Sequence, residues 1–389
     1  MADRIVDLGG IPEKFIQEKR YDYLLEDDYL VPEGFLVHLS EQSQFQAATS
    51  SVYMMFETVL NDLIKDGKLS EFDLPEKMIE LIEYSWQNNH MHLLGRFDFA
   101  GGIDDNPPKL LEYNADTPTM VPESGQVQDA FKEFYTTTKA DQYNRLDELM
   151  ELAFNKLGNI NSTSHHSMLF TTLGYEEDKT NLRPIMQAAQ RAGFHTKYAD
   201  LQDIVFDEDE GVFIEELTGE SIQFDYLYKL VPWEFVCYEE PELLDILHKL
   251  ITNDLVYVLN PAYTLIFQSK QFLEYVYNAY PKSEFLLKTS SDRKVFYGKR
   301  YVEKVTFGRL GENIKIYTAD HQIVEETDGD FGDFDSVYQE FTKLYRDDDG
   351  DVYQASMFNV DGMAASLSFR RGEKLIIDDD AEFIPHFVI

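Results

Sequence analysis

The spacing of hydrophobic residues predicts a largely helical first part of the chain. Between residues 41 and 65 apolar side chains recur at helical spacing, and Gly67 closes the stretch as a helix stop does. Residues 74–86, 124–138 and 141–156 show the same periodicity. We therefore expect four helices in this part of the chain.

Between the second and third of these helices the pattern changes to that of strands. Residues 93–99 and 109–113 are predicted strands, and residues 101–108 between them are dense in glycine, aspartate and proline. Such residues form turns because glycine and asparagine tolerate left-handed backbone and proline fixes φ. The pattern therefore predicts a β-hairpin.

A strand, helix and strand follow one another in the middle of the chain. The apolar run 167–173, the helical stretch 181–192 and the strand 195–198 have the spacing of a βαβ unit. A further strand at 226–228 and a helix at 243–251 continue this alternation. We expect a small parallel sheet here.

The last third has the alternation of strands, and most of its sheet should be antiparallel. Asp361 and Gly362 supply the Asp-Gly signal of a two-residue hairpin turn. The predicted fold class is therefore mixed, α+β with an α/β segment. The expected strands of this part cover residues 300–306, 314–318, 337–341, 353–360 and 363–369.

Charge narrows the range of partners. The 389 residues include 34 Lys and Arg but 72 Asp and Glu, which gives a formal net charge of −38. A surface this acidic repels phosphate backbones and anionic lipids, so we expect no nucleic-acid or membrane partner. Cationic partners fit the charge, and so does an interpretation in which it serves solubility alone.

Cysteine content and motifs exclude further classes. The single cysteine, Cys237, rules out an internal disulfide framework and a cysteine-based zinc site. The chain starts with no basic and apolar leader and has no apolar run of transmembrane length, so we expect a cytoplasmic protein. The phosphate loop, dinucleotide fingerprint, nucleophile elbow and zincin motif are all absent.

The predicted hairpin carries a cluster of polar residues. Because side chains alternate along a strand, Arg96 and Asp98 share one face, and Glu112 and Asn114 share one face of the next strand. Two carboxylates and an amide oxygen suit Mg²⁺, which prefers oxygen ligands. An alternative interpretation is a surface salt-bridge ladder in which Arg96 pairs with Glu112.

Two lysines suggest a site for nucleotide phosphates. Lys270 lies at the start of a predicted helix, and Lys304 lies on a strand that precedes the glycine-containing loop 308–313. A lysine next to loop amides can hold a phosphate group. Each lysine could equally be a solvated surface residue, and the same holds for Arg370.

Taken together, these residues resemble the synthetase domain of glutathionylspermidine synthase and its stand-alone relatives. The resemblance runs in order from about residue 96 to the end of the chain, and the stretch 111–117, Leu-Glu-Tyr-Asn-Ala-Asp-Thr, is its most specific part. It implies an ATP-grasp fold with circularly permuted chain order and an inserted Rossmann-like, pre-ATP-grasp substrate domain. The other matching segments are 96–98, 232–234, Lys270, Lys304, 308–314 and 384–386.

The resemblance also implies roles for the candidate residues. Asp98, Glu112 and Asn114 would hold two Mg²⁺ ions, Arg96 would steady the transition state, and Arg370 would belong to a mobile catalytic loop. The residues implied to contact or border ATP are Lys270, Lys304, Leu310, Gly311, Gln339, Glu340, Phe341, Gln354 and Leu375.

Substrate contacts follow from the same resemblance. Thr117 would meet a peptide-like acid, and Glu177, Asp178 and Glu382 would meet a polyamine. Where family members place a threonine that touches glutathione, this chain has Leu230, so the identity of the acid stays open. The oligomeric state stays open as well.

We therefore expect a ligase that joins a peptide-like carboxylate to a polyamine-like amine through an acyl phosphate. The expected domains are helices and a metal-binding hairpin at 1–160, a Rossmann-like domain at 161–255, and nucleotide-clamping lobes at 256–389. No cysteine lies where the amidase domain of bifunctional members would be. Two alternatives are an ATP-binding sensor that has lost acyl transfer and, less consistent with the lysines, a metal-dependent hydrolase.

Overall fold

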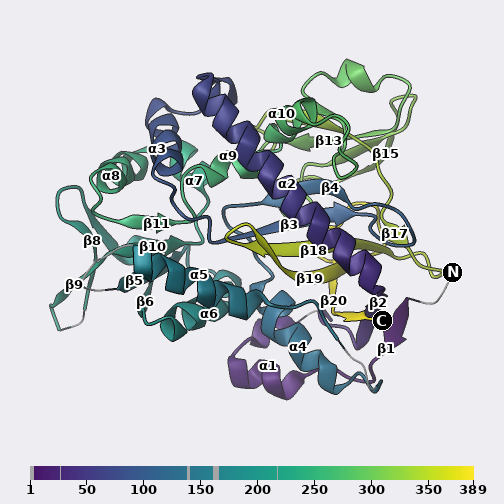
Figure 1. Cartoon of the computed structure of the whole chain (residues 1–389), viewed down its shortest axis with the longest axis horizontal. Coiled ribbons are helices and arrows are strands. Elements are labelled where there is room, and N and C mark those ends of the chain that lie inside the picture. The colour runs from purple at the N-terminus through teal and green to yellow at the C-terminus, as the bar shows by residue number, and fades with distance from the viewer. Residues whose placement is uncertain (1–3, 27, 138–140, 161–165, 217) are drawn as a thin grey trace.

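The computed structural model describes residues 4–26, 28–137, 141–160, 166–216 and 218–389. Its longest helix, α2 (Leu39–Lys65), runs diagonally across the molecule in Figure 1, above a central antiparallel sheet. Phe45, Val52 and Phe56 of this helix are fully buried at helical spacing, as the sequence predicted. The Glu41 carboxylate accepts a 2.8 Å hydrogen bond from the backbone N–H of His38 and so caps the first turn.

The central sheet joins the beginning and the end of the chain. The predicted hairpin is confirmed, and its first strand pairs antiparallel with a C-terminal strand, so that Asp98 lies opposite Ser356. The Asp361-Gly362 turn is confirmed too, with both residues at positive φ. In spatial order the strands are β20 (Glu382–Ile384), β19 (Met363–Gly372), β18 (Val352–Val360), β3 (Leu94–Ala100) and β4 (Lys109–Asn114), and β17 (Tyr345–Arg346) also pairs with β18.

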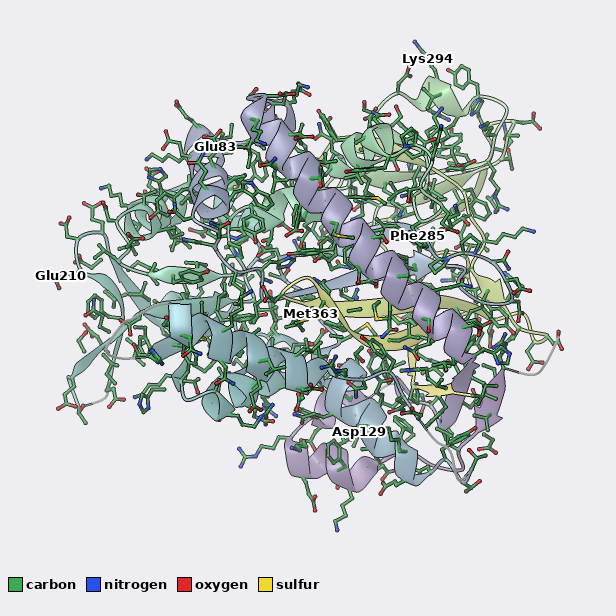
Figure 2. The ribbon with its side chains drawn as sticks, viewed as in Figure 1. Glu83, Asp129, Glu210, Phe285, Lys294 and Met363 are labelled. Carbon is green, nitrogen blue, oxygen red and sulfur yellow. The ribbon has the colours of Figure 1, made fainter. Side chains whose placement is uncertain are left out.

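A four-stranded parallel sheet forms the second unit, as the βαβ pattern predicted. Its order is β11 (Tyr257–Leu259), β10 (Tyr226–Lys229), β5 (Ser167–Thr172) and β6 (His195–Asp200). A small antiparallel sheet of β7 (Ile204–Asp207), β8 (Gly211–Glu215) and β9 (Ser221–Phe224) extends from it. Glu210 marks the turn between β7 and β8 at the left edge of Figure 2.

A five-stranded antiparallel sheet forms the third unit, at the upper right of Figure 1. Lys294, in the short helical turn Arg293–Phe296, lies at its outer edge in Figure 2. The strand order is β12 (Thr289–Ser290), β16 (Ser336–Glu340), β13 (Tyr301–Val305), β14 (Lys315–Tyr317) and β15 (Ile323–Glu326).

Segments near the two ends of the chain meet in a three-stranded sheet that the hydrophobic pattern did not predict. Strand β2 (Glu33–Val37) lies between β1 (Ile5–Asp7) and β21 (His386–Val388), antiparallel to the first and parallel to the second. The remaining helices are α1 (Glu13–Lys19), α3 (Glu76–Gln87), α4 (Gln128–Ala130), α5 (Leu146–Ile160), α6 (Glu176–Arg191), α7 (Trp233–Tyr238), α8 (Pro241–Thr252), α9 (Thr264–Gln268) and α10 (Phe272–Ala279). Within the described ranges, no helix is long and apolar enough to span a bilayer.

Several boundaries differ from the prediction. The stretch 124–138 breaks into a π-helical turn (Glu123–Val127), α4 and a 3₁₀ turn (Phe131–Glu133). Helix α5 begins at Leu146 rather than at 141, because the preceding backbone pairs with distant strands: the N–H of Arg145 donates to Ala365 O at 2.8 Å. This helix ends at Ile160, at the predicted domain boundary, and residues 161–165 lie outside the described residues.

Helix α6 begins five residues before the predicted start, at Glu176 rather than 181. Its acidic first turn contains Glu176, Glu177 and Asp178, which an amphipathic pattern does not reveal because none of the three is apolar. Negative charge is favourable at this end of a helix because it faces the positive end of the helix dipole. The two predicted amine-binding acids therefore lie on a helix and not in a loop.

Candidate active site

A cavity of about 800 Å³ lies between the three units of the fold. Strands β3 and β4 of the central sheet, strands β13 and β16 of the five-stranded sheet, and the first turn of α6 all contribute to its walls. Sixteen of the eighteen predicted site residues line it; the other two are Lys270, directly behind the wall, and Glu382. The fold thus brings together residues that are up to 279 positions apart in the sequence, from Arg96 to Leu375.

One wall carries the arginine and acids of the hairpin. The guanidinium of Arg96 donates to both oxygens of Asp98, from Nε at 3.0 Å and from Nη2 at 2.9 Å. Asp98 also accepts hydrogen bonds from Ser356 Oγ at 2.7 Å and Asn114 Nδ2 at 3.0 Å. The side chain of Arg96 therefore pairs along its own strand and not with Glu112, and because Asp98 is only 1% exposed, the salt-bridge ladder on a surface is wrong.

Glu112 lies beside the two predicted phosphate-binding lysines. Its Oε2 is 3.2 Å from Lys270 Nζ, and 26% of its side chain is exposed. Burial tends to raise its pKa, but the positive charges of Lys270 and Lys304 lower that pKa to about 2. The carboxylate is therefore ionised throughout the physiological pH range.

Both lysines are buried, so the interpretation as solvated surface residues is wrong for them. Lys270 donates to Gly308 O at 2.6 Å, and Lys304 donates to Leu111 O at 3.0 Å. Burial is the main reason that the pKa of Lys304 falls to about 8, although Glu112 acts to raise it. Two ammonium groups held in place next to a cavity can bind an anion such as a polyphosphate.

The loop after Lys304 approaches the opposite wall closely. Leu310 and Gly311 both have positive φ. A Cβ added at Gly311 would lie 2.5 Å from Ile377 O, so the approach of the two backbones requires glycine. Leu310 and Gly311 of this loop line the cavity, together with Gly308 and Arg309.

Five of the residues predicted to contact or border the nucleotide come from two different sheets and line the cavity. Gln339 and Glu340 come from β16, Phe341 follows that strand, Gln354 comes from β18, and Leu375 follows β19. The guanidinium of Arg300 stacks on the ring of Phe341, with its central carbon 3.7 Å from the ring centroid.

Three of the four predicted substrate residues, Thr117, Glu177 and Asp178, also line the cavity. Burial raises the pKa of Glu177, and burial together with the charge of Glu177 raises the pKa of Asp178 to about 6. Arg370 also lines this region and donates from Nη2 to Asp378 O at 2.6 Å.

Glu382 does not reach the cavity, contrary to the prediction. It lies opposite Arg371 in the β19–β20 pair, and its carboxylate accepts a 2.5 Å hydrogen bond from Arg371 Nε. Arg371 also pairs with Glu33. The alternation of side chains explains the difference, because Arg370 and Arg371 are consecutive on one strand and point to opposite faces.

The hairpin provides an oxygen-rich donor set. In the described part of the chain, no group of three or more His, Cys, Asp and Glu residues has the arrangement of a metal site. Asp98, Glu112 and the amide of Asn114 nevertheless line one wall, and Glu112 is partly open to the cavity. Glu112 and the amide oxygen of Asn114 suit Mg²⁺, because that ion keeps several waters and phosphate oxygens and needs few protein ligands. Both oxygens of Asp98 already accept hydrogen bonds from Arg96.

Several lining residues carried no signal in the sequence. Tyr23, Tyr29 and Glu123 line the cavity in this way. Arg309, which pairs with Glu234, belongs by contrast to a segment that carries the resemblance. The two tyrosines precede all of those segments, which begin at about residue 96. They reach the cavity only through the N-terminal fold.

These observations agree with comparisons to known proteins. The family model described as glutathionylspermidine synthase preATP-grasp matches residues 13–389, so the chain belongs to this family. A putative acid–amine ligase from Haemophilus influenzae is 27% identical over 365 residues, which cover 90% of this chain and 88% of that protein. The resemblance inferred from the motifs is therefore confirmed.

Two further similarities are informative. The bifunctional glutathionylspermidine synthetase/amidase of Escherichia coli is 24% identical, with 99% of this chain and 65% of that protein covered. A solved structure of a glutathione synthetase-like effector (GSS30) from Globodera pallida matches 98% of each chain with a TM-score of 0.55 at 8% identity. This second likeness supports a shared mixed α+β fold and carries no information on substrates.

Proposed function

We propose that this protein is an ATP- and Mg²⁺-dependent ligase that forms an amide between a peptide-like carboxylate and a polyamine-like amine. The observation that carries the proposal is the cluster of Glu112, Lys270 and Lys304 beside the Arg96–Asp98 pair at one end of a large cavity. The acids Glu177 and Asp178, which line the same cavity, complement a cationic substrate.

Chemistry explains why both kinds of group are needed. A carboxylate resists attack by an amine until one oxygen becomes a leaving group. Transfer of the γ-phosphoryl group of ATP to a carboxylate oxygen gives an acyl phosphate and ADP. The amine lone pair then forms the C–N bond, phosphate departs with the electrons of the C–O bond, and the nitrogen gives up a proton.

The residues have distinct parts in this proposal. Lys270 and Lys304 hold phosphate oxygens, and Leu310 and Gly311 cover them, while Gln339, Glu340 and Phe341 border the base. Arg96 stabilises the negative charge that develops during transfer. Mg²⁺ held by Asp98, Glu112 and Asn114 would offset the repulsion between the carboxylate and the triphosphate.

We also propose that the chain has an ATP-grasp fold in circularly permuted order. Support comes from the central sheet, where a hairpin near residue 100 pairs with the C-terminal strand β18. The three-part division at about residues 160 and 255 belongs to the same proposal, although β11 extends the parallel sheet to Leu259.

The Glu112→Gln variant tests the ligase proposal. With ATP, Mg²⁺ and a matrix of small peptides and amines, we expect wild-type ADP release to require one acid and one amine together. The variant should lose on the order of 10²-fold or more in kcat and unfold at the wild-type temperature, since it removes one electrostatic partner of the reaction. The exposed Glu133→Gln variant loses the same charge and serves as control.

Two outcomes would contradict the proposal. Full ADP release by the Glu112→Gln variant would show that the metal assignment is wrong. ATP binding by the wild-type protein without ADP release for any pair of substrates would instead favour an ATP-binding sensor, the alternative that Leu230 in the cavity wall suggests.

A further inference from the structure

Strand β15 lies at the edge of the five-stranded sheet (Figure 1), and one of its carboxylates binds backbone outside that sheet. The two oxygens of Glu325 accept hydrogen bonds from consecutive N–H groups, Oε2 from Leu375 at 3.2 Å and Oε1 from Ile376 at 2.6 Å. Both donors belong to residues 373–381, the segment between β19 and β20, which we call the C-terminal loop. Because β19 and β20 belong to the central sheet, this carboxylate joins two units of the fold.

The register of the five-stranded sheet explains why Glu325 faces this loop. Glu325 lies opposite Ile316 of β14, which lies opposite Val302 of β13, and Val302 lies opposite Gln339 of β16. Directly opposed residues of an antiparallel sheet have their side chains on the same face. Since Ile316, Val302 and Gln339 line the cavity, Glu325 is on the cavity face of the sheet, whereas the next residue, Glu326, is on the opposite face.

The C-terminal loop meets the loop 308–313 at the cavity wall. Leu375, Ile376 and Ile377 line the cavity, and Ile377 O is the atom that a Cβ at Gly311 would approach to 2.5 Å. Thr327, which directly follows β15, donates from Oγ1 to Gly311 O at 2.6 Å. The end of one strand therefore holds both loops close to the point where they meet.

The position of the C-terminal loop also affects Arg370. Its Nη2 donates to Asp378 O of this loop, as described above. Arg370 is 9% exposed and lines the cavity. A displacement of the loop would therefore change both the cavity wall and the surroundings of this guanidinium.

We propose that Glu325 is a positioning residue that holds the C-terminal loop against the cavity and thereby sets the affinity for ATP. The inference rests on the proposed function and deepens it, because Glu325 acts on the same site although it does not itself line the cavity. A loop that is already held in place has less conformational freedom to lose when the nucleotide binds. Without the carboxylate, only a fraction of the molecules have the loop in place, and the measured Kd rises in inverse proportion to that fraction.

Two competing explanations of Glu325 predict other results. If its charge acted only by repelling the triphosphate, removal of the charge would strengthen ATP binding. If the carboxylate only stabilised the fold, its removal would lower the unfolding temperature and leave the affinity of the folded protein for ATP unchanged.

Calorimetric titration of the full chain with ATP and Mg²⁺ distinguishes the three explanations. Glu325→Ala removes both acceptor oxygens, whereas Glu325→Gln keeps one oxygen and replaces the other with an amino group, which cannot accept from an N–H. We expect the affinity for ATP to fall by about tenfold in the alanine variant and by about threefold in the glutamine variant. The same two substitutions at Glu326, which faces Lys315 at the exposed surface, should leave the affinity at the wild-type value.

Hydrogen exchange without nucleotide tests the contact itself. The N–H groups of Leu375 and Ile376 should exchange at least about tenfold faster in the Glu325→Ala variant than in wild type, because their acceptor is lost. Unchanged exchange in the buried strands of the central sheet reports that the variant is folded.

Unchanged or tighter ATP binding by the Glu325→Ala variant would overturn the inference, and so would unchanged exchange at residues 375 and 376. An equal loss of affinity in the Glu325 and Glu326 variants would overturn it as well. None of these measurements depends on turnover. If the affinity for ATP depends on Glu325 but no acid and amine together yield ADP, the ligase proposal fails alone; if ADP release requires both substrates and the KM for ATP is unchanged in the variant, the positioning role alone is wrong.

Discussion

Glu112 and Asp116 are four residues apart in the sequence, and each pairs with a lysine from a distant segment. The two pairs differ in how much of the carboxylate stays accessible. Asp116 is fully buried, and its carboxylate accepts from Lys229 Nζ at 2.8 and 3.1 Å and from the backbone N–H of Trp233 at 2.7 Å. Glu112 keeps 26% of its side chain open to the cavity and lies 3.2 Å from Lys270. The Asp116 carboxylate therefore has all its hydrogen bonds within the protein, whereas the Glu112 carboxylate can still contact a ligand.

The difference shows how the same side chains can build a scaffold or a site. Lys229 makes a third hydrogen bond, to Val231 O at 2.9 Å, and its Nζ lies 4.3 Å from the ring centroid of Trp233. Nothing in this network is available to a substrate. It fixes the backbone at both ends, next to Thr117 on one side and Leu230 on the other, and both of those residues line the cavity.

The largest expected effect on stability is at the buried Asp116–Lys229 pair. Lys229→Met leaves the Asp116 carboxylate buried without its cation, and we expect the free energy of unfolding to fall by about 3–5 kcal/mol. Urea denaturation measures this loss. Adding Asp116→Asn to the variant should restore part of the stability, whereas Lys249→Met, at an exposed salt bridge, should change it little. A wild-type midpoint for Lys229→Met would contradict the comparison.

Glu123 combines features of the two pairs. Its side chain is buried, as that of Asp116 is, but one of its carboxylate oxygens has no hydrogen-bond partner among the described residues. Its pKa is raised from 4.5 to about 7 in the folded state, so the folded protein holds this proton more tightly than the unfolded chain does. Its stabilising contribution is therefore complete below about pH 4.5 and declines by roughly 3 kcal/mol as the pH rises to about 7.

The Glu123→Gln variant should lack this decline. We expect its stability relative to wild type to increase between about pH 4.5 and pH 7, by an amount that thermal or urea unfolding at several pH values can measure. Glu177 and Asp178, whose pKa values are also raised, titrate in both proteins and cancel in the difference. Parallel stability curves for the two proteins would refute the prediction.

The smallest effect on stability is expected at the partly exposed Glu112–Lys270 pair. Lys270→Met should change the free energy of unfolding by only about 1 kcal/mol, because Glu112 keeps Lys304 and contact with solvent. Its affinity for ATP should nevertheless fall by about tenfold, since a phosphate contact is lost. Calorimetry with ATP and thermal unfolding distinguish the two effects. A strong loss of stability without a loss of ATP affinity would assign Lys270 to the scaffold.

Much of the candidate site was predictable because it depends on local geometry. The face shared by Arg96 and Asp98 follows from strand alternation, and the hairpin itself follows from the turn-forming residues between the two strands. The buried face of helix α2 likewise follows from apolar periodicity. Such features need no knowledge of distant contacts.

The failures have a different cause, which is the effect of distant segments. Residues 141–145 have helical periodicity, but their backbone pairs with C-terminal strands. Glu382 has the right charge for an amine, yet the register of β20 turns it to Arg371. Tyr23 and Tyr29 reach the cavity through contacts with Glu123, about 100 residues away in sequence, and no local pattern encodes this.

The pairing of β3 with β18 has a consequence for how the protein is made. Ser356 and Asp98, which are hydrogen-bonded across these strands, lie 258 positions apart. A ribosome that adds about 5–20 residues per second needs roughly 13–50 s to cover that interval. During this time one edge of the nascent hairpin lacks its native neighbour, so the emerging chain depends on protection from association with other unpaired strands until its last segment leaves the exit tunnel.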